Sequence, residues 1–209
     1  MEFKIKSCYL AKAKSSCLIL GVFDKRKLSG PAEEIDEASG GALSTLLKKG
    51  DLDGAGCGCV VAYDVPGVAA ERVMLVGCGK RKELDRKAYE KALATALSRL
   101  SELRIAEALC ALAELPAGMD LYRTIRQGVL KAAYSAYRYT RTKEQPKDAP
   151  PPLEQFAFWV PKKQSSATAA RAAAHGKAIA DGVALARELG NLPGNICTPS
   201  YLADQAMQL

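Results

Sequence analysis

The sequence predicts an α/β fold in which helices cover a mostly parallel sheet. Segments with the pattern of strands alternate along the chain with segments that have the pattern of helices, an order typical of such sheets. One strand segment, residues 17–23, is a continuous apolar run, as expected of a fully buried strand. The chain has 209 residues and is 48% hydrophobic, which is enough to form a real core.

The first 50 residues predict two strands and one helix. Residues 3–7 alternate apolar and polar side chains like a half-buried strand, and the apolar run at 17–23 follows. Residues 29–34 supply a capping hydroxyl, an early proline and two carboxylates, which together favour a helix start. We expect this helix to continue towards Lys49 and to end at Gly50.

The middle of the chain continues the alternation. Residues 57–63 and 72–76 are rich in β-branched or small apolar side chains, and the turn-forming residues 64–67 join them as two strands. Residues 86–104 place apolar side chains at three- and four-residue steps, which predicts a helix with one apolar stripe. Residues 105–112 are apolar enough for another buried strand.

Two further helices are predicted, with a strand between them. Residues 121–136 have the apolar spacing of an amphipathic helix, expected to end near Thr140, and the charged, proline-rich residues 143–152 predict a loop. A strand follows at 156–160. The alanine-rich residues 166–189 have high helix propensity and predict a long connecting helix.

Charge and hydrophobic pattern indicate where in the cell the protein is located. Lys and Arg outnumber Asp and Glu by 30 to 23, and the resulting net charge of +7 permits contact with nucleic acid without requiring it. Lysines interrupt the first 14 residues, so no signal peptide is predicted, and no apolar run could span a bilayer. We therefore expect a cytoplasmic protein without a membrane segment.

The chain has an odd number of cysteines, in mostly apolar surroundings, which is typical of reduced thiols: Cys8, Cys17, Cys57, Cys59, Cys78, Cys110 and Cys197.

The last 24 residues predict a helix end, a tight turn and the start of another helix. Gly190 and Asn191 suit a left-handed helix end, and Thr198 and Pro199 suit an N-cap and a first helical position. Apolar side chains then gather on one face of a helix that is too short to be stable alone. This pattern predicts that the chain is truncated and that another domain follows.

The same segment carries a family resemblance. Asn191, Pro193, Asn195 and Pro199 match the Asn-x-Pro-x-Asn-x-x-x-Pro signature that opens the catalytic domain of M17 leucyl aminopeptidases, the cytosol aminopeptidase family. Residues 66–80, which end in Val-Gly-Cys-Gly-Lys, are similar to a strand and turn of that family. The resemblance covers essentially the whole chain.

This resemblance implies a division of the chain and a function. It implies a three-layer, macro-domain-like domain over residues 1–164, a linking helix over 165–190 and the start of a catalytic domain over 191–209. The full-length parent would be a cytosolic metalloprotease, a homohexameric hydrolase that releases N-terminal amino acids from peptides in protein turnover. This chain would be its non-catalytic assembly or regulatory domain, with its own catalytic domain as partner.

The implied chemistry depends on metals. M17 enzymes hold two divalent ions, usually zinc, manganese or magnesium, which activate a water molecule and polarise the scissile carbonyl. The family's ligands are a lysine, three aspartates and a glutamate, and their motifs would lie beyond Leu209. We therefore expect no catalytic, cofactor-binding or metal-binding residue in this chain, and no activity from the chain alone.

A nucleotide-binding or ADP-ribose-binding macro-like module is one alternative function. Gly77 and Gly79 follow a predicted strand, where backbone amides could meet a phosphate, and Lys80, Arg81 and Lys82 would attract it. The third glycine of a dinucleotide fingerprint is absent, which favours a simple turn.

A DNA-binding accessory domain is the other alternative. Basic and tyrosine side chains are interleaved in one region and could follow a phosphate backbone, although a solvated helix face explains the same pattern. The basic residues are Arg123, Arg126, Lys131, Arg138, Arg141, Lys143 and Lys147, and the tyrosines are Tyr122, Tyr134, Tyr137 and Tyr139.

Three more side chains favour structural interpretations. Cys57 and Cys59 would face the same side of a strand, but no second pair stands at zinc spacing, so buried thiols are predicted. His175 is the only histidine, and no carboxylate near it in sequence could orient it for base catalysis. We expect it to be a surface or interface residue.

Overall fold

The computed structural model describes residues 1–115, 118–143, 148–162 and 164–209. Its core is a seven-stranded sheet in the order β1-β7-β6-β2-β5-β4, with β3 paired to β2. The strands are β1 (Glu2–Lys6), β2 (Leu18–Phe23), β3 (Lys27–Leu28), β4 (Cys59–Tyr63), β5 (Arg72–Gly77), β6 (Glu107–Cys110) and β7 (Gln155–Trp159). The α-helices are α1 (Gly30–Ala38), α2 (Ala42–Lys48), α3 (Arg86–Glu102), α4 (Leu121–Ala136), α5 (Ser166–Asn191) and α6 (Pro199–Met207).

The sheet is mixed and mostly parallel, as predicted. β1, β7, β6, β2 and β5 pair in parallel, whereas β4 and the two-residue β3 pair antiparallel to β5 and β2. The apolar segment that predicted a fully buried strand forms β2, and every residue of β2 is buried.

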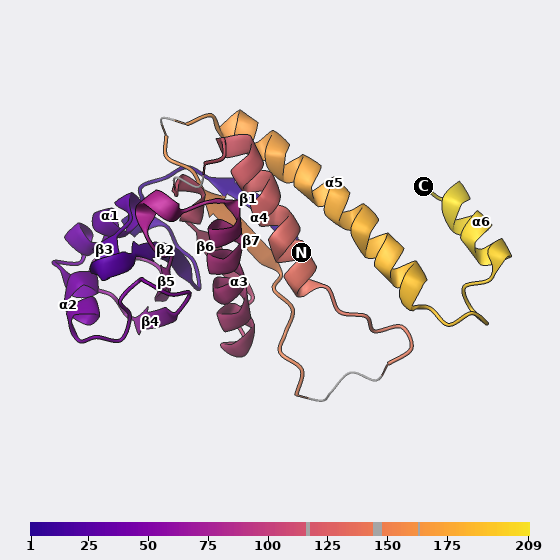
Figure 1. Ribbon diagram of the computed structural model, residues 1–209, viewed down its shortest axis with the longest axis horizontal. Helices are drawn as coiled ribbons and strands as arrows, with labels where there is room; N and C mark the ends of the chain where they lie inside the picture. Colours follow the sequence, from indigo (N-terminus) through magenta and orange to yellow (C-terminus); the bar gives the residue numbers. More distant parts are fainter. Residues whose placement is uncertain (116–117, 144–147, 163) are drawn as a thin grey trace.

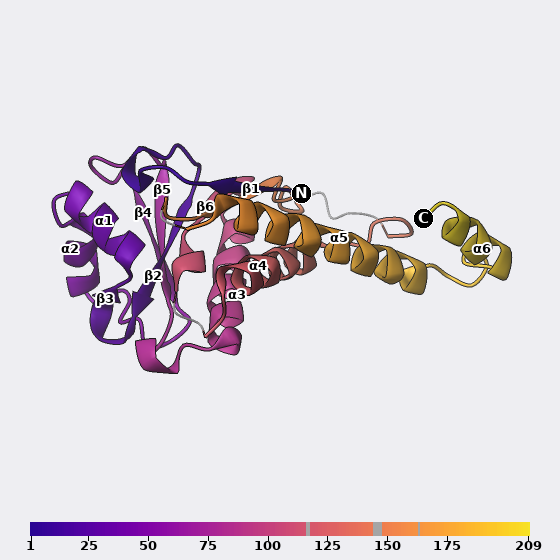
Figure 2. The same cartoon turned by 90° about the horizontal axis from the view of Figure 1, so that it is seen from above.

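Helices cover both faces, so the molecule has three layers (Figure 2). α1 and α2 pack on one face, over alternate residues of the central strands such as Leu20 and Leu75. α3, α4 and α5 pack on the other, over Ile19, Met74 and the edge-on pair Phe156 and Phe158. Alternate residues of a strand point to opposite faces, so one strand serves both cores.

α4 and α5 run side by side in the same direction (Figure 1). Tyr122, at the start of α4, contacts His175 in the first half of α5, and Tyr137, just after α4, contacts Glu188 near the end of α5. The first half of α5 buries small side chains, including Ala169 and Ala172, which allow it to approach the domain closely. Among the described residues, no helix has both the length and the apolar composition needed to cross a bilayer.

The single helix expected from residue 29 to Lys49 is wrong, because the chain forms α1 and α2 instead. Gly40 and Gly41 separate them with φ values of 67° and 86°, a left-handed conformation that breaks the helix and that glycine adopts without strain. Ser29 precedes α1, but its hydroxyl makes no capping hydrogen bond.

Two other predicted elements were longer than those in the structure. α4 ends at Ala136, before the expected Thr140, because Tyr137 adopts an extended conformation. The segment expected to be a strand at 105–112 supplies β6 and then a short 3-10 turn, η4 (Leu112–Glu114). The predicted loop at 143–152 is described only in part, since residues 144–147 lie outside the described ranges.

Candidate functional site

The glycine-rich exit from β5 is a backbone packing site. The amides of residues 77–79 all donate to protein carbonyl oxygens at 2.8–2.9 Å, those of Gly58, Val22 and Gly54. A Cβ added to Gly77 would lie 2.0 Å from the carbonyl oxygen of Gly56, so glycine is required for the close approach. These amides are therefore engaged within the protein, which agrees with the simple turn that the sequence favoured and gives no support to the alternative of a phosphate cradle.

The helix that follows this exit is also unsuited to a phosphate. The chain first forms a 3-10 turn, η3 (Arg81–Glu83), and α3 begins only afterwards. The Asp85 carboxylate accepts a hydrogen bond from the amide of Ala88 at 2.8 Å, which places a negative charge at the positive end of α3.

All seven cysteines are free thiols. Cys57 and Cys59 are only half-buried, so the prediction that both are buried is wrong in degree. Cys59 is the first residue of β4, at one edge of the sheet, and Cys57 lies in the loop before that strand. Burial raises the pKa of Cys59, as it does for the interior thiols. In the described parts of the chain, no three His, Cys, Asp or Glu side chains form a group that could hold a metal ion.

His175 lies at the surface between α4 and α5, which confirms its predicted place. Its Nδ1 is 2.7 Å from the Tyr122 hydroxyl, and the two rings meet edge-on. The guanidinium groups of Arg126 and Arg171 lie 5.5 and 5.9 Å from the centre of the Tyr122 ring. The histidine thus belongs to a contact between two helices.

Two tyrosines of the basic region, Tyr134 and Tyr137, hold α5 against α4. Arg187 of α5 lies 4.6 Å from the ring centre of Tyr134 and 3.8 Å from that of Tyr137. The Tyr137 hydroxyl donates to Glu188 Oε1 at 2.7 Å and accepts from Asn191 Nδ2 at 3.2 Å. We call these five residues the α5 anchor. Asn191, the first residue of the junction signature, is thereby tied to the end of α4.

Sequence reasoning missed Arg187 and Glu188 in this anchor. The three-residue spacing of Tyr134 and Tyr137 indicates a shared helix face, but their partners lie some 50 residues away, so no local pattern could pair them.

The basic residues after α4 also make contacts within the chain. Arg138 donates to the carbonyl oxygens of Ser135 and Tyr137, at the end of α4. Arg141 donates to the Tyr201 hydroxyl of α6 at 2.9 Å. Lys147 lies outside the described residues. Arg141 thus links the segment after α4 to α6, whereas the contacts of Arg138 stay at the end of α4.

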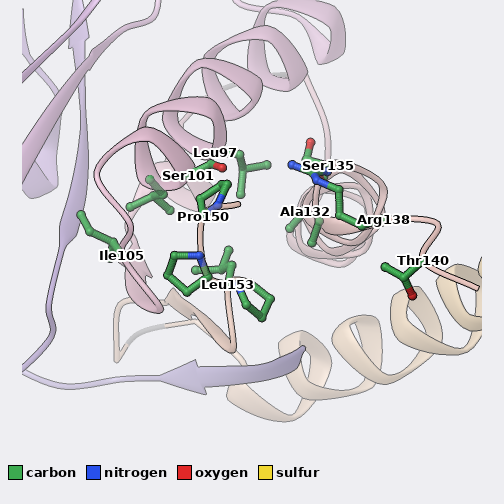
Figure 3. A pocket seen from close by; sticks show the side chains of 13 residues that line it. Leu97, Ser101, Ile105, Ala132, Ser135, Arg138, Thr140, Pro150 and Leu153 are labelled. Atoms are coloured by element: carbon green, nitrogen blue, oxygen red, sulfur yellow. The ribbon is translucent and has the colours of Figure 1, made fainter. Parts of the chain in front are cut away.

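A cavity of about 390 Å³ lies between the end of α3, the end of α4 and the proline segment at 150–152 (Figure 3). Leu97, Ala132 and Leu153 give it mostly apolar walls. Its lining offers no acid, base or nucleophile pair, so it has no evident chemistry.

α5 extends past the end of α4, and α6 lies beyond the C-terminal end of α5 (Figures 1 and 2). Thr198 caps α6 through the amide of Tyr201, and Pro199 occupies its first position, as predicted. No residue of α6 is buried. Large apolar side chains are exposed along this C-terminal part of the chain: Ile179, Val183, Ile196, Leu202, Met207 and Leu209.

Comparison with known proteins identifies relatives of the chain. Residues 19–146 match the family described as the cytosol aminopeptidase family, N-terminal domain. A probable cytosol aminopeptidase of Idiomarina loihiensis is 42% identical over 207 residues, which cover 99% of this chain and 41% of that protein. One from Tolumonas auensis is 41% identical over 210 residues, covering 100% of this chain and 42% of that protein. The chain thus spans about two fifths of the length of these curated relatives.

Solved structures share the fold. A tomato leucine aminopeptidase mutant matches with a TM-score of 0.74 and 20% identity, over 100% of this chain and 41% of that chain. A bottromycin maturation enzyme, BotP, solved in complex with Mn, matches with a TM-score of 0.65 and 19% identity, over 92% of this chain and 35% of that chain. With a family match over more than half of its length and relatives about 40% identical throughout, the chain belongs to the cytosol aminopeptidase family, whose N-terminal domain it contains.

Proposed function

We propose that this chain is the non-catalytic N-terminal domain of a metal-dependent leucyl aminopeptidase, which releases N-terminal amino acids from peptides during protein turnover in the cytoplasm. The observation that carries the proposal is the identity of about 40% over the whole chain with probable cytosol aminopeptidases. The chain covers two fifths of each relative, which leaves three fifths of such a protein for the peptidase domain.

The domain's own role is to hold and orient the peptidase domain. We divide the chain into the three-layer domain at 1–164, the linking helix at 165–190 and the first part of the peptidase domain at 191–209. The exposed apolar side chains of α6, including Leu202 and Met207, would dock on the remainder of the same polypeptide. The α5 anchor would set the direction in which that remainder begins.

Two divalent metal ions, manganese, zinc or magnesium, would bind in the part of the enzyme that this chain does not cover. BotP, which shares the fold of this chain, was solved in complex with Mn. The ions would supply an activated water molecule and a polarised carbonyl, and no residue of this chain would take part. We further propose that the full-length protein is a homohexamer, in which this domain contributes to assembly.

Hydrolysis of leucine p-nitroanilide tests the proposal. The complete gene product should release p-nitroaniline with added Mn²⁺ and lose this activity with EDTA, whereas residues 1–209 alone should show no release under either condition. Metal-dependent hydrolysis by residues 1–209, or an inactive but folded complete product, would contradict it.

A further inference from the structure

A second cavity, of about 620 Å³, lies at the carboxyl ends of β2 and β5. Those two strands are parallel neighbours, and ligands of α/β proteins bind in crevices at such strand ends. The volume lies within the range of small-molecule sites. The cavity borders the glycine-rich exit from β5 but needs none of its amides, which are already engaged.

Basic side chains dominate the lining of this cavity. Five of them contribute: Lys25, Lys27, Lys80, Arg81 and Lys82. Among the described residues, the side chains of Lys25, Lys27 and Lys82 have no ion-pair partner. The Arg81 guanidinium lies 5.5 Å from the ring centre of Phe23, which also lines the cavity and gives it an apolar wall.

Three carboxylates line the same cavity, and two of them are already engaged. Glu83 pairs with Lys80 at 2.9 Å, and Asp24 accepts the backbone amide of Lys25 at 2.8 Å. Glu33 lies in the first turn of α1. Five basic groups against three acidic ones leave an excess of two positive charges.

The backbone that presents Lys25 is strained. Lys25 and Arg26 are consecutive non-glycine residues with φ values of 61° and 60°. Residues other than glycine, asparagine and aspartate rarely adopt this conformation, and such strain clusters at ligand sites. Hydrogen bonds from Asp24 N to Gly79 O and from Arg26 N to Asp53 O hold the loop in place. A glycine at position 25 would relieve the strain but would remove a positive charge from the cavity.

We propose that this cavity binds a small ligand that carries several phosphate groups. Lys25, Lys27 and Lys82 supply charge, and Arg81, held against Phe23, supplies the planar fork that suits phosphate oxygens. This role is separate from peptide hydrolysis, so its failure would leave the proposed enzyme function untouched.

Calorimetric titration of the full chain with inorganic tripolyphosphate tests the site. We expect binding that weakens about tenfold or more in Arg81→Met, which keeps an unbranched side chain over Phe23 without the charge. Lys25→Gly should weaken binding by about fivefold. Its melting temperature should stay unchanged or rise by up to about 4 °C, because the strain is relieved. Lys143→Gln, which removes an exposed charge outside the cavity, is the matched control and should bind like the wild type.

Several results would overturn the proposal. Wild-type protein that does not bind tripolyphosphate at millimolar concentrations is one, and equal losses in Arg81→Met, Lys25→Gly and Lys143→Gln are another, since they would indicate unspecific attraction. Binding of a DNA duplex that weakens in the two cavity variants, without any binding of tripolyphosphate, would assign the site to nucleic acid instead. A clear fall in the melting temperature of Lys25→Gly would contradict the strained loop.

Discussion

Gly77 lies where the fold leaves no room for a side chain. A Cβ there would overlap the carbonyl oxygen of Gly56, whereas nothing lies within 4 Å of a Cβ added to Gly182 in α5. We expect Gly77→Ala to lower the free energy of unfolding by about 2–4 kcal/mol, because β5 or the facing loop must move. Gly182→Ala, the control, should leave it unchanged or raise it by about 0.5–1 kcal/mol. Urea unfolding measures both, and equal stabilities would contradict the close approach.

The interior thiols predict a loss of stability at alkaline pH. Burial raises the pKa of Cys17, Cys78 and Cys110 from 9.0 to about 12. The unfolded chain therefore loses these protons first as the pH rises, which favours unfolding. Their contribution to stability is complete below pH 9 and is lost progressively between about pH 9 and 12. The midpoint of urea unfolding should fall over this window, and less so in Cys110→Ala. An identical decline in both proteins would rule out a contribution from Cys110.

At the scale of secondary structure, the α5 anchor predicts which hydroxyl holds the linking helix. Tyr137→Phe keeps the ring beside Arg187 but loses the hydrogen bonds to Glu188 and Asn191. We expect a local loss of about 1 kcal/mol, which would speed hydrogen exchange in the last turn of α5 about fivefold. Tyr134→Phe is the matched control, because it keeps the other ring and removes a hydroxyl that makes no hydrogen bond to any described residue. Equal exchange in both variants would contradict the anchor.

Local patterns predicted most elements but not how they combine. The apolar run of β2 and the alanine-rich α5 were identified because burial and helix propensity leave clear local signals. The break at Gly40 and Gly41 was missed because the helix-start signal at residues 29–34 was given more weight than the Gly-Gly pair, itself a turn signal. β3 has only two residues, too few for a pattern. The strand order and the pairing of Tyr137 with Arg187 depend on distant contacts, which no local spacing encodes. The junction signature identified the family, whereas the lysines of the cavity at β2 were distant in sequence and gave no joint signal.

At the scale of the whole molecule, one compact three-layer body carries a long helix that leaves it. Apolar cores on both faces of the sheet stabilise this body, while α6 and the end of α5 expose apolar side chains. Leu202 is 44% exposed and Met207 is 79% exposed, although both lie on a capped, regular helix. A docking partner would explain why this helix retains an apolar face, since exposed patches of this kind mark interaction sites.

Hydrogen exchange of α6 tests most directly whether residues 191–209 begin a further domain that buries their exposed apolar side chains. The amides of residues 200–207 should exchange at least 100-fold more slowly in the complete gene product than in residues 1–209 alone, because docking would bury the helix. Amides in the middle of α3, which is packed in the domain core, should exchange at the same rate in both proteins. Fast exchange of α6 in the complete, active product would contradict the docking role.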